Sequence, residues 1–274
     1  MPHLRLHVDA GLVEGEEIVL PAAASRHAAK TLRLEAGDSI IVFDGRSDFE
    51  YEATIIASRT GRAGRGGGLR AVLGAARAVA SESPLRIELA QGLCKGERMD
   101  FTVQKATELG VCAIHPLLCE RSVSRPEGER AKRRIERWRE VAIHAAGQSG
   151  RVRIPTIASI QAYGDWVRRG SIEDAKNESL EEGSFAFPPG FFLHPEASES
   201  FSDLASADFE RRKSDPEKPV RLIVGPEGGF SPREIDAAQE AGYRGLRLGP
   251  RVLRTETAGP VAIALLQSRW GDLG

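Results

Sequence analysis

The sequence predicts an α/β protein: a mainly parallel sheet in residues 81–274, preceded by a small β-rich domain in residues 1–80. Strand-like and helix-like segments alternate from residue 85 to the C-terminus, as they do in parallel sheets covered by helices. Residues 1–80 instead contain several short strand-like runs at close spacing. Near the C-terminus, two short strands each run into a turn rich in Gly and Pro that opens a helix.

Composition predicts a cytoplasmic protein without a membrane span or a metal site. Of 274 residues, 41% are hydrophobic and 28% charged, which is ordinary for a globular protein of one large or two modest domains. No apolar run reaches membrane-spanning length, and polar residues occupy the N-terminus where a secretory signal would be apolar. Cys94, Cys112 and Cys119 lack the spacing of a zinc site and are odd in number, so we expect free thiols.

The first 80 residues predict a small barrel that carries a basic segment. We expect strands at 17–20, 39–43, 51–56 and 69–73, with one helix over 22–32. No acidic residue lies between positions 53 and 81, although this segment holds five arginines and six glycines. Net charge near −1 gives no overall attraction to nucleic acid, so any such binding needs a local patch. The basic segment is either a solvated hairpin tip or an arm that lies along phosphates.

The second domain opens with alternating strands and helices. We expect a strand at 85–89, a loop at 92–96 and a helix at 97–109 that ends at Gly110. A strand at 111–118 and a long helix at 127–147 follow. The long helix has many arginines outside its apolar stripe, which is typical of a solvated face.

Residues 168–220 are the least informative part of the sequence. An acidic stretch within them favours a surface loop. Residues 191–193 form a short buried strand, and His194 begins the loop at its end. A lone histidine before a proline is more often a turn residue than a general base, and we interpret His194 in that way.

The C-terminal quarter predicts a ligand site. The apolar run 222–224 ends in Gly-Pro, and Ser231, Pro232 and Glu234 form a capping box that opens a helix ending at Gly242. A second strand at 246–248 ends in Gly249-Pro250, and a final helix begins at about Thr257. Strand, glycine-rich loop and helix form sites for nucleotide-like ligands, although neither loop has a standard nucleotide fingerprint. Alternatively, the glycines only shape tight turns.

The exact residues add a resemblance that spans nearly the whole chain. GPEGGFSPREID (225–236) and LGPRVLRTET (248–257) resemble paired signatures of the SPOUT RNA methyltransferases, and most closely of the RsmE family. The stretches 26–45, 95–111, 119–123 and 145–151 are similar to the same family. The resemblance implies a PUA-like RNA-binding barrel, a C-terminal trefoil knot that binds S-adenosylmethionine, and a homodimer. It implies methylation of N3 of a specific uridine in 16S rRNA of the 30S subunit.

The resemblance also assigns candidate residues. Methyl transfer needs an aligned nucleophile and a way to remove the uracil N3 proton or stabilise charge on the uracil oxygens, so we expect Arg254 and Glu256 to be catalytic. Alternatively, these two form an ion pair that holds the last turn. Cofactor contacts are expected from Leu193, His194, Pro195, Gly225, Pro226, Glu227, Gly228, Gly229, Leu248, Gly249, Val252, Leu253 and Thr257. RNA contacts are expected from Arg5, Arg33, Arg62, Arg65, Arg70, Gln148 and Arg151.

Two other functions stay open on the sequence alone. A SPOUT enzyme could methylate a ribose 2′-hydroxyl, although the match in the N-terminal domain and at CERSV argues against it. A catalytically silent RNA-binding or assembly protein could keep the fold, although the intact GPEGG and LRTET loops argue against this.

Overall fold

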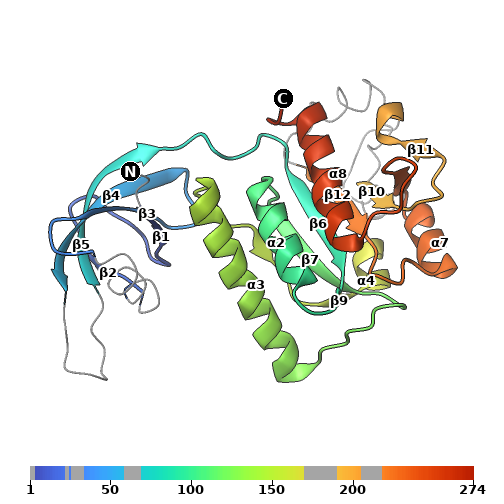
Figure 1. The fold of residues 1–274 in the computed structure, drawn as a ribbon, viewed down its shortest axis with the longest axis horizontal. Coiled ribbons are helices and arrows are strands. Elements are labelled where there is room, and N and C mark those ends of the chain that lie inside the picture. The colour runs from blue at the N-terminus through green and yellow to red at the C-terminus, as the bar shows by residue number, and fades with distance from the viewer. Residues whose placement is uncertain (1–3, 22–24, 26–33, 59–68, 170–189, 205–217) are drawn as a thin grey trace, which may run out of the picture. The chain divides into compact units, whose positions relative to one another are not determined.

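The computed structural model describes residues 4–21, 25, 34–58, 69–169, 190–204 and 218–274 (Figure 1). The chain divides into two compact units. Unit 1 comprises Met1–Glu82 and Ile143–Ile154, and unit 2 comprises Ser83–Ala142 and Pro155–Gly274. The boundary expected after residue 80 lies close to the first division, but the sequence analysis places residues 143–154 in the second domain.

Unit 1 is built on a five-stranded sheet with the order β1-β3-β4-β5-β2. Strand β1 pairs parallel with β3, and the other pairs are antiparallel. The strands are β1 (Arg5–His7), β2 (Glu17–Val19), β3 (Ser39–Phe43), β4 (Phe49–Ser58) and β5 (Leu69–Ala78). The four expected strands are therefore present, whereas β1 was missed because three residues give too short a pattern. The helix expected at 22–32 lies outside the described residues.

Two groups of buried side chains stabilise unit 1. Alternate residues of the strands, among them Ile40, Val42 and Ile55, form its apolar core. Phe43 packs with Ala146 and Val152 in a second cluster, which places the segment Ile143–Ile154 in this unit. The peptide N–H of Ile154 also donates to the carbonyl oxygen of Gly45 at 3.0 Å.

Unit 2 contains an eight-stranded sheet in which all the pairs are parallel, as the sequence predicts. The order is β11-β13-β10-β12-β6-β7-β8, and β9 also pairs with β7. The strands are β6 (Ile87–Gly92), β7 (Ala113–Leu118), β8 (Thr156–Ile157), β9 (Gln161–Ala162), β10 (Gly190–Leu193), β11 (Glu199–Ser200), β12 (Val220–Val224) and β13 (Arg244–Arg247). Strand β10 lies between β12 and β13, so the loops after these three strands share one edge of the sheet.

Helices cover both faces of this sheet (Figure 1). The described helices are α2 (Arg98–Glu108), α3 (Gly128–Ser149), α4 (Tyr163–Arg168), α7 (Pro232–Glu240) and α8 (Thr255–Trp270), with a 3-10 turn at Phe201–Asp203. Helix α3 ends within the unit 1 segment Ile143–Ile154. Helix α8 packs against α2 and lies close to Leu89 of β6 and Val224 of β12. Ala90 and Ile223, which adjoin these residues in the two strands, belong instead to a cluster beneath α4 and α7. Side chains on opposite faces of each strand therefore contact different helices.

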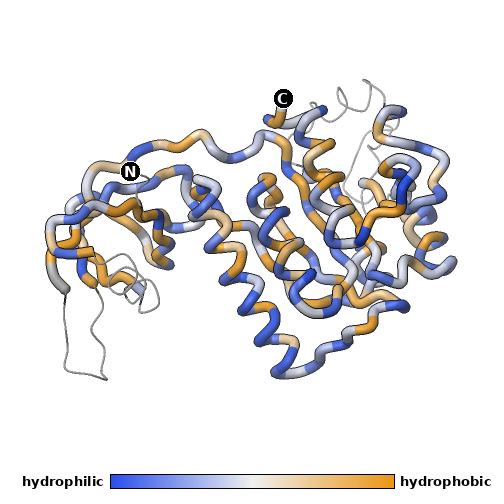
Figure 2. Tube along the Cα trace, in the orientation of Figure 1, coloured by the Kyte–Doolittle hydropathy of each residue, from blue (hydrophilic) through white to orange (hydrophobic). Residues whose placement is uncertain are grey.

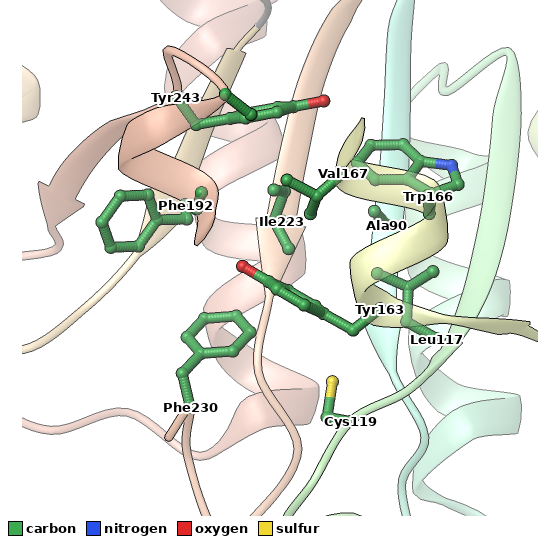
Figure 3. Close-up of a cluster of buried hydrophobic side chains, with 12 residues drawn as sticks. Ala90, Leu117, Cys119, Tyr163, Trp166, Val167, Phe192, Ile223, Phe230 and Tyr243 are labelled. Carbon is green, nitrogen blue, oxygen red and sulfur yellow. The ribbon is translucent and has the colours of Figure 1, made fainter. Parts of the chain in front are cut away.

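Aromatic side chains fill the layer beneath α4 and α7 (Figure 3). Tyr163 and Trp166 come from α4, Phe192 from β10, Phe230 from the loop after β12, and Tyr243 from the turn before β13. The phenol of Tyr163 donates to the carbonyl oxygen of Glu234 at 2.8 Å, which satisfies the polar end of a buried ring. This cluster fixes α7, and with it the loop that precedes α7.

Several element boundaries differ by a few residues from those expected, among them those of β6 and α8. Strand β6 continues through Gly92, where a loop was expected. Gln91 and Gly92 interrupt the apolar pattern of the sequence, but both are buried and remain part of the strand. Helix α8 begins at Thr255, two residues before the expected start. The short helix α4 was not expected at all.

Hydrophilic residues dominate the first turns of α3 (Figure 2). In the described part of the chain, no helix is both long and apolar enough to cross a membrane.

Candidate active site

A cavity of about 500 Å³ lies within unit 2, at the carboxyl ends of β10, β12 and β13. Ligand pockets of this size are usual for cofactors and small molecules. Thirteen of the fifteen residues expected at the cofactor or in catalysis line it. They are Leu193, His194, Pro195, Gly225, Pro226, Glu227, Gly229, Leu248, Gly249, Val252, Leu253, Arg254 and Glu256. The two motif loops therefore form one site.

Gly228 and Thr257 are the two expected residues that do not line the cavity. Gly228 faces Arg121: its carbonyl oxygen accepts from that guanidinium at 3.2 Å, and a Cβ atom here would lie 2.9 Å from the Cβ of Arg121. Thr257 is exposed in the first turn of α8. Gly228 therefore supports the loop after β12 without lining the cavity.

The loop after β12 is held in a tight conformation. The peptide N–H of Gly229 donates to the carbonyl oxygen of Pro226 at 2.9 Å, and Gly229 has a positive φ of 68°. The expected capping box follows: the hydroxyl of Ser231 accepts from the peptide N–H of Glu234 at 3.2 Å, and the Glu234 carboxylate accepts from that of Ser231 at 2.8 Å. The loop crosses close to the end of β6, as the space around Gly92 shows: a Cβ atom added there would lie 2.5 Å from the nitrogen of Pro226.

A buried hydrogen-bond chain joins the two motif loops. The hydroxyl of Thr255 donates to the carbonyl oxygen of Gly225 at 2.5 Å. The same hydroxyl accepts from the side-chain amide of Gln91 at 2.9 Å, and Gln91 is fully buried. The end of β6, the loop after β12 and the start of α8 are thus connected. Sequence analysis missed Gln91 and Thr255, although a glutamine within an otherwise apolar strand is a signal for such a role.

Two carboxylates and one guanidinium lie together on the wall of the cavity. Glu227 Oε1 accepts from the peptide N–H of Lys95 at 2.8 Å and from Arg98 at 2.9 Å. Arg98 Nε also lies 3.6 Å from Glu256 Oε1. Burial acts to raise the pKa of Glu227, but the Lys95 peptide N–H and Arg98 outweigh it, so that this pKa is lowered. Arg98 therefore pairs with one acidic residue from each motif loop.

Arg254 and Glu256 occupy different environments at the start of α8. Arg254 is the exposed N-cap residue, and its carbonyl oxygen accepts from the peptide N–H groups of Thr257 and Ala258. Glu256 lies in the first turn, where a carboxylate interacts favourably with the helix dipole. Among the described residues, the ion-pair partner of Glu256 is Arg98. The alternative, an ion pair of Arg254 with Glu256, is not formed among the described residues.

The loop after β10 completes the cavity. The peptide N–H of His194 donates to the carbonyl oxygen of Leu246, and Nδ1 of its ring accepts from the peptide N–H of Glu196 at 3.3 Å. These contacts agree with the interpretation of His194 as a turn residue. Eight further lining residues were not among the expected site residues, and they include Arg98 from the segment KGERMDF (95–101), Arg121 from CERSV (119–123) and two residues of α8. The eight are Arg98, Arg121, Val224, Phe230, Leu246, Arg251, Thr255 and Ala258.

The residues expected to contact RNA have different surroundings in unit 1. Arg5 contacts buried Glu50 and donates to the carbonyl oxygens of Gly150 and Arg151 at 3.1 Å. Burial lowers the pKa of Arg5. The Arg151 side chain is only 5% exposed and pairs with Glu82 at 2.7 Å. These two arginines make contacts that stabilise unit 1, and their expected contact with RNA stays a prediction.

The other expected RNA contacts are surface residues or lie outside the description. Arg70 is partly exposed and pairs with Glu17, and Gln148 is exposed near the end of α3. Arg33, Arg62 and Arg65 lie outside the described residues. In the described ranges, no group of three or more His, Cys, Asp or Glu side chains is placed to hold a metal ion. The cysteines are free thiols, and burial raises the pKa of Cys94 to about 12.

Comparison with known proteins assigns the chain to a family. Residues 81–267 match the family described as RNA methyltransferase domain. Over 273 residues, the chain is 32% identical to ribosomal RNA small subunit methyltransferase E of Mycobacterium tuberculosis, covering 98% of this chain and 94% of that protein. This chain belongs to the ribosomal RNA small subunit methyltransferase E family. The resemblance to RsmE proteins is thereby confirmed.

Solved structures of RsmE-like proteins share the fold along the whole chain. The RsmE of Neisseria gonorrhoeae, bound to S-adenosylmethionine, is 31% identical with a TM-score of 0.81 and covers 99% of this chain and 100% of that one. A Legionella pneumophila protein solved in complex with SAM is 32% identical with a TM-score of 0.82 and covers both chains fully. A further relative by sequence is the RsmE of Bacillus subtilis, which is 33% identical over 190 residues, or 68% of this chain and 66% of that protein.

Proposed function

We propose that this RsmE-family protein is an S-adenosylmethionine-dependent methyltransferase that acts on N3 of a specific uridine in 16S rRNA of the 30S subunit. The observation that carries the proposal is the meeting of the GPEGG and LRTET loops in one cavity, joined by the bond between Thr255 and Gly225. Related structures contain S-adenosylmethionine. When bound, the cofactor supplies a methyl group on a positively charged sulfur.

The cavity fits such a cofactor. Its walls combine glycines, aliphatic side chains and backbone groups, which suit an adenine ring better than a cluster of charges would. We propose that the backbone of Leu193, Gly225, Leu248 and Leu253 holds the adenine. We also propose that the segment from β13 into α8 is threaded as a trefoil knot; the position of β10 between β12 and β13 is compatible with this path.

The charged residues of the cavity supply what the target base needs. Uracil N3 carries a weakly acidic proton that must leave for N3 to become a nucleophile. Arg254, exposed at the start of α8, would donate hydrogen bonds to a uracil oxygen that gains charge. Glu256 would take the N3 proton. Its Oε2 is buried without a hydrogen-bond partner among the described residues, so a donor on the target base would satisfy it.

Access to N3 requires an unpaired or extruded uridine, because base pairing covers that atom. We propose that unit 1, as a PUA-like barrel in residues 1–80, grips the RNA away from the reacting base. Exposed Gln148 and partly exposed Arg70 are the described candidates for this contact, and Arg33, Arg62 and Arg65 are further candidates from the sequence. The proposed functional form is a homodimer.

Binding and transfer measurements test the enzyme assignment. Isothermal titration should give one S-adenosylmethionine site per chain, and labelled methyl should pass to 30S subunits that lack the modification. Free 16S rRNA serves as the control for a requirement for the assembled subunit. A protein that binds 30S subunits but not the cofactor would be a silent RNA-binding factor instead, and the proposal would fail.

A further inference from the structure

The contacts of Arg98 set it apart from the other arginines on the cavity wall. It lies in the first turn of α2, within the KGERMDF segment, and its side chain is 44% exposed. The guanidinium lies 2.9 Å from Glu227 Oε1 and 3.6 Å from Glu256 Oε1. A planar group with several donors suits such a bridge between two carboxylates better than a lysine ammonium does. Arg98 thus connects the loop after β12 with the first turn of α8.

The two carboxylates depend on Arg98 to different degrees. Glu227 also accepts the peptide N–H of Lys95, so it keeps a donor when Arg98 is removed. Glu256 is paired with Arg98 through Oε1, and its Oε2 is buried without a hydrogen-bond partner among the described residues. A carboxylate with one oxygen fixed and the other available is oriented to accept a hydrogen bond from a bound molecule. Loss of Arg98 should therefore change the position of the Glu256 carboxylate more than that of Glu227.

We infer that Arg98 is a positioning residue for methyl transfer: it holds Glu256 Oε1 so that Oε2 stays available to the N–H group of the target base. The inference rests on the proposed function, because it assigns Glu256 a substrate contact. Arg98 itself makes no contact with the reacting atoms in this scheme. Its loss should therefore lower the rate of the bound complex, while cofactor binding changes little.

A double-variant cycle tests this inference with Arg98→Ala, Glu256→Gln and the combination. At saturating cofactor and 30S subunits, Arg98→Ala should lower kcat about 10- to 100-fold, since small misplacement of a reacting group has effects of this size. Its dissociation constant for S-adenosylmethionine should change by less than about threefold. In the Glu256→Gln background, adding Arg98→Ala should lower kcat by less than about threefold, because the residue it positions is already altered.

Two further variants separate positioning from folding. Arg98→Lys keeps a positive charge and should recover part of kcat, which a purely structural defect would not explain. Arg137→Ala is the matched control: it removes an exposed arginine of α3 that pairs with Asp100 of α2, and it should leave kcat unchanged. Additive losses in the cycle, or a loss of cofactor affinity as large as the loss of kcat, would overturn the inference.

The wild-type protein tests the proposed function in the same assay. Methyl transfer by the wild type with additive variant effects would reject only the role of Arg98. Absence of transfer by the wild type would reject the proposed function and the inference together.

Discussion

The hydroxyl of Thr255 lies 2.5 Å from the carbonyl oxygen of Gly225, so the first residue of α8 is bonded to the loop after β12. These residues belong to different sequence motifs, 30 positions apart in the chain. Gln91 adds a second bond to the same hydroxyl from the end of β6. The cavity therefore depends on buried contacts behind its walls as well as on the residues that line it.

Replacing Thr255 with valine should weaken both the fold and cofactor binding. Valine keeps the shape but removes the hydroxyl, which leaves the Gly225 carbonyl and the Gln91 amide without this partner. Leaving buried polar groups unsatisfied costs about 1–3 kcal/mol of the free energy of unfolding. Urea denaturation and calorimetric titration with S-adenosylmethionine measure the two effects. Thr255→Ser keeps the hydroxyl and should stay close to wild type; equal losses in both variants would contradict the role of the bond.

Gly92→Ala should destabilise unit 2 by forcing the cofactor loop away from β6. The new Cβ would lie 2.5 Å from the nitrogen of Pro226, and a backbone neighbour cannot turn aside as a side chain does. Overpacking of this kind costs about 1–3 kcal/mol or more. Gly11→Ala is the control, because its Cβ would meet no atom within 4 Å. Thermal unfolding of both variants compares them, and a Gly92→Ala protein as stable as wild type would refute the close approach.

Arg254→Ala should lower methylation far more than it lowers cofactor affinity. The side chain is exposed at the cavity, where we propose that it stabilises charge on the target base. Removing such a donor lowers kcat by about 10²- to 10³-fold in comparable sites. Single-turnover methyl transfer and calorimetry with S-adenosylmethionine separate the two steps. Parallel losses of rate and cofactor affinity would remove the proposed role at the base.

Glu227→Gln should destabilise the protein in a pH-dependent way. The pKa of Glu227 is lowered from 4.5 in the folded state, so its charged form contributes stability that is present above pH 4.5. This contribution is lost as pH falls through the lower folded pKa. The difference from wild type in the free energy of unfolding should therefore be constant at neutral pH and shrink below pH 4.5. Denaturation across pH measures it, and a difference that grows in acid would contradict the assignment. Glu129→Gln, in an exposed pair with Lys132, is the control and should change little.

Neutralising Arg62, Arg65 and Arg70 together should weaken binding to 30S subunits in a salt-dependent way. Each lost phosphate contact should reduce the slope of log K against log salt concentration by about 0.7–0.9. Filter binding across salt concentrations gives that slope. An unchanged slope would favour the solvated hairpin tip over the RNA arm.

Local sequence patterns predicted those parts of the fold that local physics determines. Strand β3 has its expected bounds, and the Ser231–Glu234 capping box is formed by the two hydrogen bonds that the residues suggest. A ligand site was predicted because the motif loops follow strands of one parallel sheet, whose carboxyl ends meet, whereas the individual residues were assigned by the resemblance to RsmE proteins.

Contacts between distant residues explain what sequence analysis missed. Arg151 was expected to contact RNA, and the fold places Glu82, 69 positions earlier, beside its side chain. Arg98 was not among the expected site residues, and only the fold places it between Glu227 and Glu256. Strand β6 extends past its apolar run to Gln91, whose side-chain amide group donates to the hydroxyl of Thr255, far along the chain.

The most direct test of the account identifies the methylated nucleoside. Unmethylated 30S subunits would be incubated with the protein and S-adenosylmethionine, and their 16S rRNA digested to nucleosides for chromatography and mass spectrometry. N3-methyluridine and 2′-O-methyluridine have the same mass but differ in whether the methyl group stays on the base or on the ribose after fragmentation. We expect N3-methyluridine, with the methyl group on the uracil base, at one position in 16S rRNA. A methylated ribose would contradict this expectation.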